Sequence, residues 1–98
     1  MKLHRNGHFY CDIIKLWSNK QIVTSTNIKM LGKSGTIQRR EYLHYLLCDK
    51  EPIIDMVRAS IIDNDGNETN ITLKSYKQVE TTKGEAYEVT FLSPKLIV

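Results

Sequence analysis

A short turn sequence between two β-favouring runs is the feature that most restricts the fold of this chain. Residues 63–68 read Asp-Asn-Asp-Gly-Asn-Glu, and Asp, Asn and Gly tolerate the positive φ angles that tight hairpin turns require. Ile61 and Ile62 precede this segment and residues 71–73 follow it, with side chains that are typical of strands. The sequence therefore predicts an antiparallel hairpin here.

Similar β-favouring runs occur along most of the chain. Residues 8–17 and 21–31 predict two strands that pair as a hairpin across the polar break at 18–20. Residues 69–79 and 86–92 predict two more, joined by a turn at 81–85, and 53–62 also suits a strand. Over 36–48 the apolar residues fit both strand and helix spacing, and a helix over 52–60 is the competing interpretation there.

We expect residues 1–98 to form one mainly β domain. It should be a small antiparallel barrel or sandwich of six or seven short strands, with room for one short helix at 36–48 or 52–60. An α+β fold is the alternative. Residues 1–7 are polar and basic, so we expect a flexible N-terminus.

The apolar runs are too short for a membrane helix, which needs roughly 18 or more residues. The first residues also lack the apolar segment of a signal peptide. We therefore expect a cytoplasmic protein without membrane contact, in which Cys11 and Cys48 are free thiols.

Motifs for catalysis or metal binding are incomplete. A phosphate-binding loop ending at Gly32-Lys33-Ser34 would need a glycine where Asn27 stands. The glycine of the 63–68 segment comes at the fourth position instead of the sixth that a calcium loop requires. Five residues are of zinc-ligand type without a Cys-x-x-Cys pair, and they are only weak metal candidates: His4, His8, Cys11, His44 and Cys48. We expect no enzymatic activity, cofactor, metal or small-molecule substrate.

The two halves of the chain differ in charge. Residues 1–50 hold nine Lys or Arg and three acids, whereas residues 51–98 hold five and eight. Basic residues attract phosphates and aromatic rings stack on bases, so the basic half could bind single-stranded nucleic acid or RNA. The candidates are Lys15, Trp17, Lys29, Lys33, Arg39, Arg40 and Tyr42.

The last three residues, Leu96, Ile97 and Val98, are apolar and suit either the core or a partner interface. Eleven isoleucines, ten lysines and six asparagines indicate an AT-rich coding sequence, as in low-GC bacteria and their phages. We expect a small non-enzymatic binding module, such as a phage or mobile-element inhibitor or assembly factor that acts through protein contacts or as a homodimer. Nucleic-acid binding is the alternative.

Overall fold

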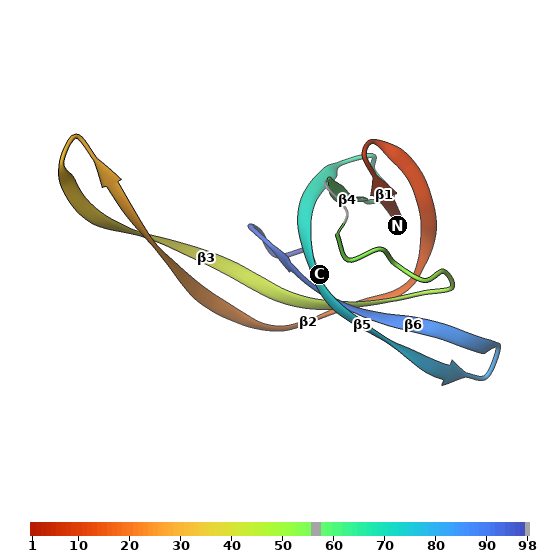
Figure 1. Cartoon of the computed structure of the whole chain (residues 1–98). Coiled ribbons are helices and arrows are strands. Elements are labelled where there is room, and N and C mark those ends of the chain that lie inside the picture. The colour runs from red at the N-terminus through yellow and green to blue at the C-terminus, as the bar shows by residue number, and fades with distance from the viewer. Residues whose placement is uncertain (56–57, 98) are drawn as a thin grey trace.

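The computed structural model describes residues 1–55 and 58–97, which form a closed antiparallel β-barrel (Figure 1). In chain order the strands are β1 (Lys2–Arg5), β2 (His8–Met30), β3 (Lys33–Cys48), β4 (Ala59–Ile62), β5 (Glu68–Thr81) and β6 (Gly84–Ser93). Around the barrel the order is β1-β2-β3-β6-β5-β4. The expected mainly β fold, an antiparallel barrel or sandwich of six or seven strands, is confirmed as a six-stranded barrel.

The described residues contain no helix, so the α+β alternative is wrong. The ambiguous segment 36–48 belongs to β3, where pairing with β2 and β6 on its two sides fixes the extended conformation. Residues 54 and 55 form a turn, and β4 begins only at Ala59. The strand predicted from residue 53 is therefore too long. Met56 and Val57, within the helix considered at 52–60, lie outside the described residues.

The polar break at 18–20 is a bulge and not a turn. The β2–β3 register shifts between Ser18 and Lys20, which leaves Asn19 as the extra residue of a single continuous strand. The predicted hairpin between 8–17 and 21–31 is wrong for this reason. The turn lies instead at Leu31 and Gly32, and β2 pairs with β3.

Strands β2 and β3 are much longer than the barrel needs. They stay paired from Ile13 and Cys48 out to Met30 and Lys33, but β6 covers β3 only from Tyr42 to Cys48. Beyond that point the two strands leave the barrel as a twisted ribbon, which makes the molecule 56 Å long and about 24 Å across (Figure 1).

The barrel interior holds the core. Its largest fully buried apolar side chains come from four strands and are Leu3, Leu46, Ile61, Val89 and Phe91. Leu3 lies in β1, which pairs with both β2 and β4 and so closes the barrel. Residues 1–7, expected to be flexible, thus contribute a strand to the closure.

The turn that begins at Asp63 joins β4 to β5, as the sequence predicts. One carboxylate oxygen, Oδ1, accepts hydrogen bonds from the backbone N–H groups of Asp65 and Asn67, both at 2.9 Å, and Gly66 has φ +85°. The hydrogen bonds from Asn67 and Asp65 lower the pKa of Asp63, because they stabilise the charged form. The Asp63 carboxylate therefore stabilises the turn.

Barrel and ribbon should differ sharply in their contribution to stability. Phe91→Ala, in the closed core, should lower the free energy of unfolding by about 3–5 kcal/mol. Ile37→Ala, on the ribbon and 46% exposed, should cost under about 1 kcal/mol. Chemical denaturation of the two variants measures this difference, and equal losses would contradict the division.

Candidate interaction surface

Residues 22–41 form a two-stranded arm that projects from the barrel. Nine cross-strand pairs, from Ile22 and Glu41 to Met30 and Lys33, hold it together. Neither outer edge of the arm pairs with another strand within the described residues. Its backbone N–H and C=O groups are therefore available along both edges, which is the arrangement that accepts an added strand from another chain.

The two faces of the arm differ in chemistry because side chains alternate along each strand. One face, the apolar face, carries Ile22, Thr24, Thr26, Ile28, Met30, Lys33, Ile37, Arg39 and Glu41. The opposite face, the polar face, carries Val23, Ser25, Asn27, Lys29, Ser34, Thr36, Gln38 and Arg40. On the apolar face Met30 is 66% exposed and Ile37 46% exposed, whereas Ile22 and Ile28 are half-buried. This face is therefore only partly covered in the monomer.

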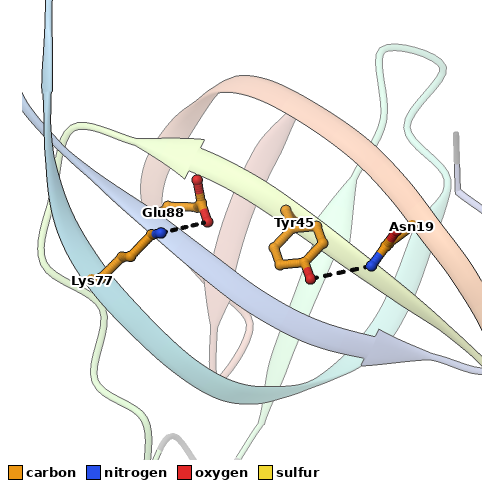
Figure 2. A network of polar contacts seen from close by, with 4 residues as sticks. All are labelled: Asn19, Tyr45, Lys77 and Glu88. Atoms are coloured by element: carbon orange, nitrogen blue, oxygen red, sulfur yellow. Dashed lines mark hydrogen bonds and ion pairs between the residues drawn. The ribbon is translucent and has the colours of Figure 1, made fainter.

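Positive charge accumulates on the arm. The arm contains four cations, Lys29, Lys33, Arg39 and Arg40, against one acid, Glu41. Among the described residues the only ion pair joins Lys77 and Glu88 at 3.7 Å, on the β5–β6 side of the barrel (Figure 2). The four arm cations thus lack a carboxylate within 4.0 Å in residues 1–55 and 58–97.

Leu31 at the tip is an unusual turn residue. Leu31 and Gly32 both have positive φ, 52° and 77°, as a type I′ hairpin turn requires. The β1–β2 turn has the same signs of φ at Asn6 and Gly7, the pair that best fits such a turn. A leucine in this conformation is disfavoured by about 1–2 kcal/mol, and its side chain is 97% exposed. Leu31 therefore adds backbone strain at the tip without contributing to the core.

An aromatic pair stands where the arm joins the barrel. Trp17 and Tyr45 stack with ring centroids 5.6 Å apart, and the Lys15 ammonium lies 5.2 Å from the Trp17 ring. The bulge residue Asn19 donates a hydrogen bond of 3.3 Å to the Tyr45 hydroxyl (Figure 2). Continuous alternation along β3 places Tyr45 and Ile37 on the same side, so the aromatic pair extends the apolar face onto the barrel.

A hollow of about 530 Å³ lies after the end of β3. Its lining is Glu51, Pro52, Ile53, Ile54, Asp55 and Tyr76, and we call it the acidic hollow. The Tyr76 hydroxyl donates a 2.6 Å hydrogen bond to the Glu51 carboxylate, which raises the pKa of Tyr76. The Tyr10 hydroxyl donates to the Glu51 main-chain carbonyl. Two tyrosines therefore hold one side of the hollow in place.

His44 is buried inside the barrel with both ring nitrogens engaged. Nδ1 lies 3.0 Å from the Tyr42 carbonyl, and Nε2 accepts a 3.3 Å hydrogen bond from the Ile97 N–H. Nε2 must be unprotonated to accept that bond, so Nδ1 carries the proton. Stacking on Phe91 at 5.1 Å completes the surroundings, and burial lowers the pKa of His44.

The predicted metal candidates do not assemble. His8 is exposed, His4 contacts Phe9 edge-on, and His44 serves the core. Cys11 and Cys48 are both buried and unbridged, and their mutual hydrogen bond together with burial raises the pKa of Cys11. In the part of the chain that the structure describes, no three His, Cys, Asp or Glu come together as a metal site requires.

The predicted interface and nucleic-acid residues fall in separate places. Of the nucleic-acid candidates, four lie on the arm: Lys29, Lys33, Arg39 and Arg40. Lys15 and Trp17 lie at the base of the arm, and Tyr42 lies where the arm joins the barrel. Ile97 packs against the core, Leu96 is exposed, and Val98 lies outside the described residues. The sequence patterns did not single out Met30 and Leu31 as interface candidates, because both fall within a predicted strand. The signal that could have identified this exposed tip is a leucine directly beside a turn glycine.

Comparisons of this chain with models of known families, with curated proteins and with solved structures found no match. No helix of the described residues is long and apolar enough to cross a membrane.

Stability should fall in mild acid because of His44. Its folded-state pKa lies below the usual 6.5, so below that pH the unfolded chain binds more protons than the folded one. The free energy of unfolding should therefore decrease as the pH falls from 7 through the folded-state pKa. The protection factor of the Ile97 amide, which corrects its exchange rate for the intrinsic pH dependence, should fall as its acceptor is protonated.

Denaturation curves between pH 7.5 and 5 measure this effect. The slope with pH should flatten in His44→Gln and persist in His8→Gln, which changes an exposed side chain. An unchanged slope in His44→Gln would refute the assignment.

Proposed function

We propose that this protein is a non-enzymatic assembly module that contacts a protein partner through the arm. The apolar face carries the proposal: it leaves isoleucine and methionine side chains in water on a ribbon that has free edges on both sides. Isolated two-stranded hairpins are at best marginally stable in water. Packing against a partner would cover the apolar side chains and pair an edge, which supports a role in protein contact.

The protein contact should depend on one face of the arm. Ile37→Asp places a negative charge on the apolar face. Gln38→Asp places the same charge at the adjacent residue, on the polar face. We expect Ile37→Asp to weaken partner binding by about tenfold or more, because it removes an aliphatic side chain that the partner would bury. Gln38→Asp should change binding much less.

Partner binding can be measured by crosslinking in cells of the native host, with a photo-reactive amino acid in place of Met30. The expected adduct resists nuclease, is destroyed by protease, and is lost with Ile37→Asp but kept with Gln38→Asp. Equal adducts with both variants, or an adduct that nuclease removes, would contradict a protein-binding arm.

Nucleic-acid binding is a second candidate, favoured by the four cations on the arm, which have no carboxylate within 4.0 Å in the described part of the chain. A narrow basic ribbon suits a nucleic-acid groove, and apolar side chains such as Leu31 can wedge between bases. The polar face adds hydroxyl and amide groups that can contact phosphates. Against it, the apolar face has no role in a purely electrostatic contact.

Salt dependence tests the second candidate. If the arm binds nucleic acid, log affinity should fall linearly with log salt, and Arg39→Ala with Arg40→Ala should reduce the slope by about 2. Lys74→Ala with Lys95→Ala, exposed cations of the barrel, should leave the slope unchanged. Titration of labelled single- and double-stranded oligonucleotides gives these slopes, and binding that is absent or insensitive to salt removes this function.

A further inference from the structure

We propose that the arm tip of one copy, residues 29–33, docks in the acidic hollow of a second copy, so that the chains associate head to tail. This inference rests on the proposed function and names its partner. It joins two surfaces that the monomer leaves unoccupied, at opposite ends of the molecule.

The tip presents two apolar side chains between two cations. Met30 and Leu31 are the most exposed large hydrophobic residues of the described chain, and Lys29 and Lys33 flank them in sequence. Within the described residues, neither lysine has a carboxylate within 4.0 Å.

The acidic hollow presents the complementary chemistry. Pro52, Ile53, Ile54 and the Tyr76 ring supply apolar lining, while Glu51 and Asp55 supply negative charge without a basic residue in the lining. Because the tyrosine hydroxyls fix Glu51, its charge is in place before anything binds. An apolar pair flanked by cations thus matches an apolar hollow flanked by acids.

The tip cannot reach the hollow of its own chain. β3 begins at the tip and runs sixteen residues to Cys48, which at about 3.3 Å per residue is roughly 50 Å of extended chain before the hollow begins. In Figure 1 the arm projects to the left, while the green segment that follows β3 lies at the barrel. The contact must therefore form between copies.

Such a contact joins two different surfaces and is heterologous. A docked pair still offers one free tip and one free hollow, so association continues until a ring closes or a filament grows. The contact is smaller than a standard interface, and we expect it to be weak, salt-sensitive and strengthened by each further contact within a closed ring.

Leu31→Asn separates binding from folding. Asparagine suits the positive φ that Asn6 already adopts at the equivalent turn, so this variant should fold at least as well as the natural chain. It removes the apolar tip, and we expect association to weaken by about tenfold or more. Sedimentation velocity of the purified full chain over a concentration series measures the assembly.

Charge reversal identifies the two surfaces. Lys33→Glu should weaken association by placing a carboxylate of the tip against the acids of the hollow, and Asp55→Lys should weaken it by placing an ammonium group of the hollow against the lysines of the tip. Combining both in one chain should restore association, because the charges are again opposite. Lys74→Glu, on the exposed surface of β5, is the matched control and should assemble like the natural chain.

A natural chain that stays monomeric at all concentrations, or a double reversal that fails to restore assembly, would overturn the head-to-tail contact. These results are distinct from the cellular adduct at Met30: a monomeric pure protein that still gives a protein adduct keeps the binding arm and loses only the self-association. An adduct with nucleic acid alone would reject both.

Discussion

The structure depends on the hydrogen-bonded ladder between β2 and β3. Inside the barrel this ladder is supported by β6, whose Val89 and Phe91 lie beside Leu46 and His44 and exclude water. Outside the barrel the same ladder continues without a third strand or a second layer. One pair of strands therefore serves both as a wall of the core and as an exposed arm, and the barrel fixes the arm at its base.

Closing the barrel requires contributions from both ends of the described chain. Leu3 in β1 seals the gap between β2 and β4, and Ile97 packs on the core while its N–H donates to His44. A short β1 can do this because its two neighbours satisfy its backbone groups on both sides. The core is small, and within the described residues every strand of the barrel pairs with two neighbours over part of its length. The longest segment with both outer edges free is the arm.

Local patterns in the sequence were sufficient for the fold class and for turns with strong chemistry. Asp63 accepts the hydrogen bonds that a turn former should accept, and Gly66 takes the positive φ that favours glycine. Local patterns gave wrong predictions where pairing with a strand distant in the sequence determines the structure. Polar residues 18–20 resemble a turn, but the partner strand continues past them and turns Asn19 into a bulge. The N-terminal strand was missed because its burial comes from β2 and β4, which no local window contains.

The candidate site was only partly predictable for a related reason. Charge pointed to Lys29, Lys33, Arg39 and Arg40, and the structure does gather them, but composition cannot show that no acid folds back onto them. Composition also cannot show whether Met30 lies in a core strand or on an exposed ribbon, because strands in either place have the same β-favouring residues.

Leu31 unites these observations. A hairpin selected only for stability would carry Asn there, as the β1–β2 turn does at Asn6. Leucine adds backbone strain, and its exposed side chain gains no burial on folding that could offset this strain. In the proposed contact, burying the side chain would contribute free energy of the same order as the strain. The proposed tip contact thus gives a role to a strained, exposed leucine that the barrel core does not use.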